Sequence, residues 1–222
     1  MIAKDMTVGE MAAREPKSMK IFKEVGIDFC CDGKDNLCDA LAKKKMSEEQ
    51  FSQKLDKLKA EKEKSKTREV NFLDMTPDAL AEYIVTTHHE YLRKALPETY
   101  DLFLKVLRVH GVNHPELYEV FKQFGAMKID LDPHLIREEV VLFPEISDRG
   151  SKKVIKLAKE LHEEHENVAV LMEKIREINH NYTLPSDACM SFKGLYQSMQ
   201  EIEEDIHQHI HLENNILFKG II

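Results

Sequence analysis

Tryptophan is absent from this sequence, and its 222 residues include only 8 glycines and 7 prolines, whereas 32% are charged. Runs that alternate apolar and polar residues, which mark half-buried β-strands, are also scarce. A chain that is poor in turn residues and rich in charge is typical of proteins built from long helices. We therefore expect an all-α fold, and the length allows one sizeable domain and one small one.

Two further absences narrow the class of protein. No stretch approaches the roughly 20 consecutive apolar residues that a membrane helix needs, and the first residues contain no apolar signal-peptide core. Basic residues are outnumbered, with 32 Lys and Arg against 40 Asp and Glu, so the formal net charge is −8. We therefore expect a cytoplasmic protein with neither a membrane nor a nucleic-acid partner, and a homodimer stays open as its oligomeric state.

The sequence contains only four cysteines, and two of these, Cys30 and Cys31, are adjacent. A disulfide between sequence neighbours is strained, so the cysteines fit no obvious disulfide framework. Cys30 and Cys31 could simply be small buried residues of an apolar core. Two adjacent thiols in a glycine-containing loop near Lys34 are also suited to thiolate chemistry or soft-metal binding, because a nearby cation lowers the pKa of a thiol.

The first 65 residues have the pattern of a small helical module. Thr7 with Glu10, and Ser47 with Gln50, form capping boxes, in which each side chain of the pair bonds the backbone N–H of the other at a helix start. Gly26 follows an apolar helical pattern and suits the left-handed position that ends a helix. We therefore predict several short helices here, with too few residues for a large core.

The run from Lys62 to Glu69 has no apolar residue and no periodicity, so we place a linker there. Beyond it, apolar residues recur three and four apart in four long segments, which is the spacing of helices buried on one face. These stripes run from Val85 to Leu107, Val120 to Val141, Leu157 to Ile175 and Leu195 to Ile216. They predict a four-helix bundle at residues 70–222, preceded by a small helical domain at residues 1–65.

Two ten-residue runs inside the predicted bundle agree with each other: HLIREEVVLF begins at His134 and HIHLENNILF begins at His209. Each run contains a His, a Glu four residues later, and a Leu and a Phe at its end. A His and a Glu four apart lie on one face of a helix, and the Leu continues that face toward the apolar interior. An unpaired carboxylate there would be costly, so these pairs predict carboxylates that bridge metal ions inside the bundle.

Six polar residues in all fall on the apolar stripes, namely His89, His134, Glu138, His165, His209 and Glu213. A single core histidine is more often hydrogen-bonded than metal-bound. Six such residues on four facing stripes would need an improbable number of buried polar partners if no metal were bound. We therefore predict a dinuclear metal site. Zinc hydrolase chemistry fits less well, because the sequence has no His-Glu-x-x-His run and no cysteine on the stripes.

The remaining histidines test this assignment. His88 is the hardest to exclude as a ligand, because it belongs to a half-apolar helical row of its own. His207 and His211 lie about 200° around the helix from His209, so they are expected to face outward. His110 lies near a predicted helix end and is expected at the surface.

The chain resembles the repair-of-iron-centres family of hemerythrin-like di-iron proteins. The sequence DFCCDGK at residues 28–34 is close to that family's DYCCGGK, and the two His-x-x-x-Glu runs follow its metal-site pattern. Asp32, where the family has glycine, and Lys219, where proline is usual, depart from it. The resemblance covers nearly the whole chain and implies a hemerythrin-like four-helix bundle. It implies that two non-haem iron ions are held by His89, His134, Glu138, His165, His209 and Glu213, with the two glutamates as bridges.

The same resemblance implies a function and catalytic roles for Cys30 and Cys31. It implies a stress-response protein that maintains iron–sulfur clusters after nitrosative or oxidative damage, with iron–sulfur proteins as clients and the di-iron centre as the iron source. One alternative is a di-iron enzyme that reduces nitric oxide to nitrous oxide, with the two thiols delivering electrons. Another is a sensor of small ligands such as nitric oxide or dioxygen. All three need the same six residues, so the sequence leaves the choice open.

Overall fold

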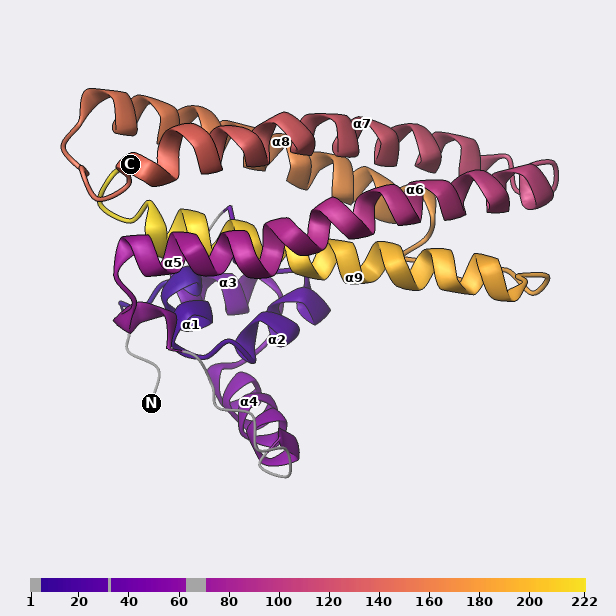
Figure 1. Ribbon diagram of the computed structural model, residues 1–222. Helices are drawn as coiled ribbons and strands as arrows, with labels where there is room; N and C mark the ends of the chain where they lie inside the picture. The colour runs from indigo at the N-terminus through magenta and orange to yellow at the C-terminus, as the bar shows by residue number, and fades with distance from the viewer. Residues whose placement is uncertain (1–4, 32, 63–70) are drawn as a thin grey trace. The chain divides into compact units, whose positions relative to one another are not determined.

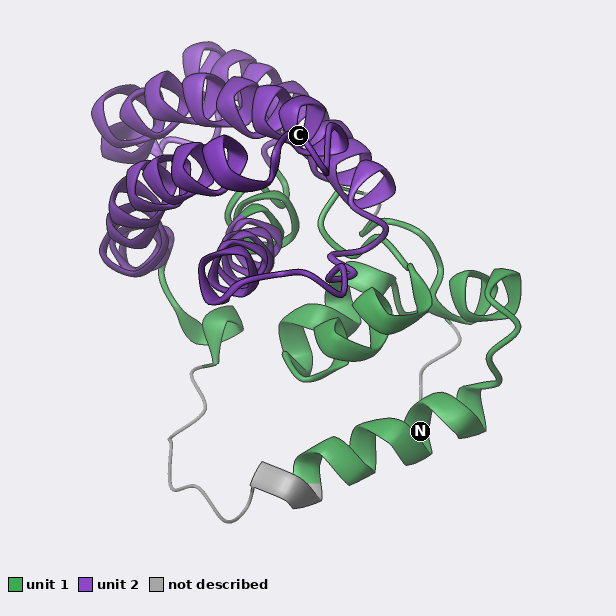
Figure 2. Ribbon diagram, turned by 90° about the vertical axis from the view of Figure 1, so that its right-hand side faces the viewer, with its two compact units in different colours: residues 1–76, 210–220 green, residues 77–209, 221–222 purple. Residues whose placement is uncertain are grey.

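The computed structural model describes residues 5–31, 33–62 and 71–222, and the regular elements in these ranges are helical (Figure 1). The predicted all-α class is therefore confirmed. The chain divides into two compact units, which Figure 2 distinguishes by colour. Unit 1 consists of Met1–Thr76 with Ile210–Gly220, and unit 2 consists of Pro77–His209 with Ile221–Ile222. Within the described ranges, no helix is both long and apolar enough to cross a membrane.

Unit 1 contains short helices whose starts and ends follow the predicted signals. Its helices are α1 (Val8–Arg14), α2 (Ser18–Val25), α3 (Leu37–Lys43) and α4 (Glu48–Lys62), followed by the 3-10 turn η1 (Phe72–Asp74). Both capping boxes are present, because the N–H of Glu10 donates to Thr7 Oγ1 at 3.1 Å and the N–H of Gln50 donates to Ser47 Oγ at 3.1 Å. Gly26 ends α2 in a left-handed conformation, with a φ of 71°. Beyond Lys62, the predicted linker lies outside the described residues.

The core of unit 1 combines residues from both ends of the chain. Phe22 and Phe51 are fully buried and stack with their ring centroids 5.5 Å apart. Asn215, which belongs to the C-terminal part of the unit, lies against Gly9 and Gly33. A Cβ atom on these glycines would lie 2.4 Å and 2.1 Å from Asn215 Oδ1, so a larger residue at either position would displace the Asn215 side chain. Glycine at both positions therefore allows the close approach of Asn215.

Unit 2 is built from the four long helical segments that the apolar stripes predict. The first segment consists of α5 (Pro77–Ile84), η2 (Val85–His89) and α6 (Glu90–His110), and the second consists of α7 (Glu116–Arg137), η3 (Glu138–Leu142) and η4 (Phe143–Glu145). The third is α8 (Lys152–Ile178). The fourth begins with α9 (Met190–Leu212), leaves unit 2 after His209 and continues as η5 (Glu213–Leu217). Pro97 and Pro133 lie inside α6 and α7, and both helices continue past them. Large apolar side chains such as Leu92, Phe103 and Phe124 fill the interior.

Three turns of π-helix interrupt these segments at the predicted ligands, and the sequence pattern does not reveal them. His89 ends η2, Glu138 begins η3 and Glu213 begins η5. In each turn the hydrogen bond spans five residues; for example, the N–H of Phe218 donates to the carbonyl of Glu213 at 2.7 Å. A π-turn inserts one extra residue into a helix and occurs frequently at functional sites. The widened turns therefore coincide with the positions from which ligands are expected.

Candidate metal centre

The six predicted ligands are all buried. Each exposes no more than 2% of its surface: His89 0%, His134 2%, Glu138 0%, His165 1%, His209 1% and Glu213 0%. They come from all four long helical segments, so the fold brings together residues that are up to 124 positions apart, from 89 to 213. Buried imidazoles and carboxylates in this number require partners or ions to compensate their lost hydration.

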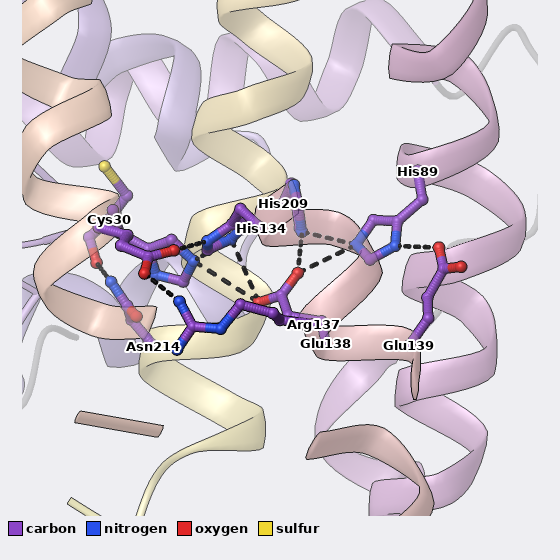
Figure 3. Close-up of polar contacts among 10 residues, drawn as sticks. Cys30, His89, His134, Arg137, Glu138, Glu139, His209 and Asn214 are labelled. Atoms are coloured by element: carbon purple, nitrogen blue, oxygen red, sulfur yellow. Dashed lines mark hydrogen bonds and ion pairs between the residues drawn. The ribbon is translucent and has the colours of Figure 1, made fainter. Parts of the chain in front are cut away.

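Glu138 is the centre of this arrangement, because each of its carboxylate oxygens faces a different pair of histidines (Figure 3). Oε1 lies 3.3 Å from His134 Nε2 and 3.8 Å from His165 Nε2. Oε2 lies 3.4 Å from His89 Nε2 and 3.9 Å from His209 Nε2. Neither oxygen has a hydrogen bond of good geometry among the described residues. A carboxylate that offers one oxygen to each of two sites has the form of a bridging ligand.

The histidines of each pair point their Nε2 atoms at each other. The distance between the Nε2 atoms of His89 and His209 is 3.1 Å, and that between His134 and His165 is also 3.1 Å. Two nitrogens that lie about 2.1 Å from one first-row ion, at right angles, are roughly 3.0 Å apart. The spacing of both pairs therefore suits two nitrogen ligands on one shared ion.

The potential ligand atoms accordingly fall into two groups, and within each group all atoms lie within 4.8 Å of one another. The first group contains His89, Glu138, His209 and Glu213, and the second contains His134, Glu138, His165 and Glu213. Glu213 follows His209 by one turn on the continuous segment of α9 and η5. Both groups share the two glutamates. The buried His/Glu cluster therefore fits a binuclear metal site.

A second layer of carboxylates fixes one histidine of each pair, and the sequence interpretation did not assign it this role. His89 Nδ1 lies 2.7 Å from Glu139 Oε1, which also accepts a hydrogen bond of 2.7 Å from Arg93. His134 Nδ1 lies 2.9 Å from Glu164 Oε2, and the other oxygen of Glu164 accepts a hydrogen bond from Arg137. A carboxylate on Nδ1 orients the ring so that Nε2 faces the ion. The available signal was that Glu139 and Glu164 are each adjacent in sequence to a predicted ligand.

Without metal, the centre holds an internal ion pair. Burial alone would lower the pKa of His134, but the charge of Glu138 and contacts with Glu138 and Glu164 outweigh it and raise the pKa to about 9. Burial alone would raise the pKa of Glu138, but the charge of His134 and contacts with His134, His165 and His89 hold it well below its usual range. Metal-free protein at neutral pH therefore contains a protonated His134 beside an ionised Glu138.

His88 is buried next to this centre but belongs to neither ligand group. Its Nδ1 lies 2.9 Å from Asp205 Oδ1, and its ring stacks on the His209 ring at a centroid distance of 5.8 Å. The expectation that His110 and His211 face solvent is wrong, because their exposed fractions are only 8% and 1%. His110 packs against Phe192 within unit 2, and His211 packs against Phe29 within unit 1. Tertiary packing, which a single-helix projection ignores, buries both rings.

Replacement of neighbouring histidines provides a direct check of the ligand assignment. His89→Ala is expected to lower the metal content of the protein, because it removes one nitrogen of a facing pair. His88→Ala is the matched control, since it deletes an equally buried imidazole of the same π-turn that contacts Asp205 instead. Metal analysis after anaerobic reconstitution distinguishes the two. Metal loss from His88→Ala with retention in His89→Ala would reverse the assignment.

The loop of unit 1 that contains Cys30 and Cys31 is held in place by hydrogen bonds with the side chains of Asp28, Asn214 and Asn215. Asp28 Oδ1 accepts hydrogen bonds from the N–H groups of Cys30 and Cys31 at 2.8 Å and 2.9 Å. The carbonyl of Cys30 accepts hydrogen bonds from Asn214 at 3.2 Å and from Asn215 at 3.1 Å. Figure 3 shows the contact with Asn214. The two Sγ atoms are 3.8 Å apart, so both residues are free thiols. Asp32, the residue that departs from the family pattern, lies outside the described residues.

The expectation of a low thiol pKa is wrong for Cys30. The side chain is 3% exposed. The contact with Cys31, burial, and the charge of Asp28 all raise the pKa of the Cys30 thiol well above its usual range. Lys34 was expected to stabilise a thiolate, but it is exposed, and the groups that act on Cys30 are another thiol and a carboxylate. At neutral pH, Cys30 is therefore a protonated thiol that needs a metal ion or a partner to lose its proton.

Both parts of the chain match known families. Residues 4–59 match ScdA_N, which is described as a domain of unknown function (DUF542). Residues 80–221, which are more than half of the chain, match the hemerythrin HHE cation binding domain. The histidines and glutamates of the buried cluster all lie within the second match.

Similar proteins cover the chain from end to end. It is 32% identical to the iron–sulfur cluster repair protein YtfE of Pectobacterium carotovorum, over 98% of this chain and 97% of that protein. It is 34% identical to a probable iron–sulfur cluster repair protein of Haemophilus influenzae, over 97% and 96%. It is 28% identical to the iron–sulfur cluster repair protein ScdA of Staphylococcus epidermidis, over the full length of both chains. With its N-terminal Cys-Cys module and its buried His/Glu cluster, the chain belongs to the hemerythrin-domain family of iron–sulfur cluster repair proteins.

Proposed function

We propose that this protein maintains iron–sulfur clusters that nitrosative or oxidative stress has damaged, and that it acts as an iron donor to iron–sulfur proteins. The observation that carries the proposal is Glu138, which presents one oxygen to each of two histidine pairs while being fully buried. The similarity over the whole length to proteins named for iron–sulfur cluster repair supports the same function.

For the metal, we propose two non-haem iron ions held by the two ligand groups. Four imidazole nitrogens and two carboxylates are donors that suit first-row ions such as iron, whereas a site for softer ions would include thiolates. When bound, the iron ions supply metal for rebuilding a damaged cluster. The outer carboxylates Glu139 and Glu164 keep the histidine rings in position whether or not iron is bound, because Arg93 and Arg137 hold them in turn.

The ion pair of the metal-free centre makes the loss of iron tolerable. Without an ion in the group that contains His134, the buried Glu138 would lack the positive charge of the metal. Because its pKa without metal is about 9, His134 then takes up a proton at neutral pH and restores a positive charge 3.3 Å from Glu138 Oε1. Proton uptake therefore offsets part of the cost of releasing iron, which is a useful property in a donor.

The group around His134 also has a route to solvent. A pocket of about 310 Å³ in unit 2 is lined by Asp130, Pro133, His134, Arg137, Glu164, Asn167 and Val168. His134 is thus a predicted ligand that lines a pocket, with Glu164 and Arg137 beside it. A small ligand such as nitric oxide or dioxygen, or a departing ion, could pass through this pocket.

We further propose that Cys30 and Cys31 receive iron in transit to a client. Ligand atoms of Asp28, Cys30 and Cys31 lie within 4.8 Å of one another, so the loop can gather two sulfurs and one oxygen around a single ion. Binding of ferrous iron would displace the protons of both thiols, and release to a client would return them. The surroundings that raise the pKa of Cys30 stabilise its protonated thiol and therefore favour this return.

Removal of both thiols tests this role. Cys30→Ser with Cys31→Ser is expected to leave the iron content unchanged and to abolish most repair of a nitric-oxide-damaged [4Fe–4S] enzyme. The assay measures the return of that enzyme's activity under anaerobic conditions. Cys38→Ser is the matched control, because Cys38 is a half-buried thiol of the same unit. Full repair by the double variant would exclude a role for the loop.

A nitric oxide reductase would give a different result in the same experiment. If the protein is an iron donor, iron should leave it in proportion to the clusters restored, and nitric oxide should yield no nitrous oxide under turnover with an electron donor. Catalytic production of nitrous oxide, with iron retained and no clusters restored, would favour the reductase. A pure sensor would bind nitric oxide without either outcome.

A further inference from the structure

A second cluster of metal-type ligands lies in unit 2, at the end where α6 turns into α7 and where the chain enters α9; both connections are at the right-hand end of unit 2 in Figure 1. His110 is the last residue of α6 and His114 follows in the turn, while Asp187 and Cys189 precede α9. Ligand atoms of His110, His114 and Asp187 lie within 4.8 Å of one another. None of these residues belongs to the buried centre around Glu138.

Each of the two histidines has a close polar contact with one residue of the segment before α9. His114 Nε2 lies 3.0 Å from Asp187 Oδ1 and 3.2 Å from its Oδ2. His110 Nε2 lies 3.2 Å from the Sγ atom of Cys189. The cluster therefore offers two imidazole nitrogens, one carboxylate and one thiol.

Neighbouring side chains hold the imidazole rings of His110 and His114 in place, as is usual for histidines that bind metal. Glu116 Oε1 lies 3.2 Å from His114 Nδ1, so a carboxylate engages the nitrogen opposite the one that faces Asp187. Phe192, which is 1% exposed, contacts both imidazoles, with ring centroids 5.2 Å from His110 and 5.7 Å from His114. Asp187 and Cys189 are exposed, which leaves them free to adjust around an ion.

We propose that His110, His114, Asp187 and Cys189 form a second metal site, which binds one divalent late first-row ion such as zinc. Nitrogen, carboxylate and thiolate donors in this number are those of tetrahedral zinc sites. Ligands about 2.1 Å from a tetrahedral ion are roughly 3.4 Å apart, so the exposed Asp187 and Cys189 would move inward to complete the site. The thiol of Cys189 loses its proton to solvent when the ion binds.

The bound ion would act as a cross-link between the two connections. The loop before α9 contains three consecutive non-glycine residues with left-handed φ angles, His180, Asn181 and Tyr182, at 52°, 55° and 59°. Such conformations are costly for residues other than glycine, so the loop needs external support. A metal that ties Asp187 and Cys189 to the end of α6 would supply it. Zinc is therefore expected to raise the melting temperature of protein whose buried centre is already loaded with iron.

The test uses zinc chloride and the iron-loaded full chain that carries Cys30→Ser and Cys31→Ser, so that the thiol loop takes up no zinc. Equilibrium dialysis followed by analysis of both metals is expected to show one zinc ion per chain in addition to the iron, with no iron displaced. His114→Ala and Asp187→Asn should each weaken zinc binding at least tenfold and cancel the rise in melting temperature, while circular dichroism and iron content stay unchanged. His162→Ala, which removes a half-buried histidine of α8 outside the cluster, is the control.

Cobalt identifies the sulfur ligand. In the chain that carries Cys30→Ser and Cys31→Ser, cobalt bound to the second site should show a thiolate charge-transfer band, and the additional change Cys189→Ser should abolish this band while keeping most of the affinity. A band that survives this substitution would remove Cys189 from the site. The proposal is overturned if the iron-loaded protein takes up no zinc, or if His114→Ala and Asp187→Asn do not weaken the uptake. Either result would show that the four residues form only a hydrogen-bonded ion-pair cluster. Because zinc is counted separately from iron, either result holds whether or not the protein is an iron donor.

Discussion

Replacement of Glu138 by alanine is expected to reduce the iron content from two ions per chain to nearly none. Glu138 faces both histidine pairs with separate atoms, at 3.3 Å and 3.8 Å for Oε1 and at 3.4 Å and 3.9 Å for Oε2. Loss of this carboxylate would remove a ligand from both ions at once and would leave Glu213 as the one carboxylate of the two ligand groups to balance the buried positive charge. By comparison, His134→Ala alters one ligand group and is expected to lower the content by about one ion.

Glu139→Gln is the matched control for Glu138→Ala. It changes the next glutamate in the chain, which contacts His89 Nδ1 from outside and can still accept that hydrogen bond as an amide. Changes in such outer residues typically weaken metal affinity about 10–100-fold, so the variant should still fill under excess iron. Iron analysis after anaerobic reconstitution measures both variants. Two ions retained by Glu138→Ala would mean that Glu138 is not a bridging ligand.

The second large effect concerns the pH dependence of stability with and without metal. In the metal-free protein, His134 has a pKa of about 9, compared with about 6.5 in an unfolded chain. A raised pKa contributes stability that is fully present below pH 6.5 and is lost as the pH rises through 9. The shift corresponds to about 3 kcal/mol, which for a chain of this size is roughly 6–12 °C in melting temperature.

Iron-loaded protein should not show this loss, because its ligand histidines are neutral and bound to metal. The difference between the melting temperatures of loaded and metal-free protein should therefore widen between pH 6.5 and pH 9. Calorimetry at several pH values measures it. His134→Gln, without metal, should flatten the pH dependence. Parallel curves for the loaded and metal-free wild type would show that the His134–Glu138 pair does not form in the metal-free centre.

The sequence predicted the helical class and the helix caps because these depend on local chemistry. Capping boxes such as Thr7 with Glu10 involve residues three apart, and the apolar stripes follow from the period of a helix. The six metal-type residues could be chosen because polar side chains on apolar stripes are costly unless they meet partners. The structure brings these six together, and their role as iron ligands remains a prediction.

Features that depend on neighbours from distant parts of the chain were missed or mistaken. The π-turn at Glu138 shifts the helical register, and the spacing of apolar residues is too coarse to show a single inserted residue. His211 was expected outside because it is opposite His209 on the helix, yet Phe29, 182 positions earlier, covers it. The pKa of Cys30 was mistaken for the same reason, since burial and Asp28 act on it through the fold.

The use of both chain ends in unit 1 has a consequence for the newborn protein. Asn214 and Asn215, which bind the carbonyl of Cys30, are synthesised only after the 133 residues from 77 to 209. At about 5–20 residues per second, a ribosome needs roughly 7–27 s to make this stretch. Throughout that interval the thiol loop has emerged without the segment that completes its unit. We therefore expect the thiols of nascent chains to react with oxidants more readily than those of finished molecules.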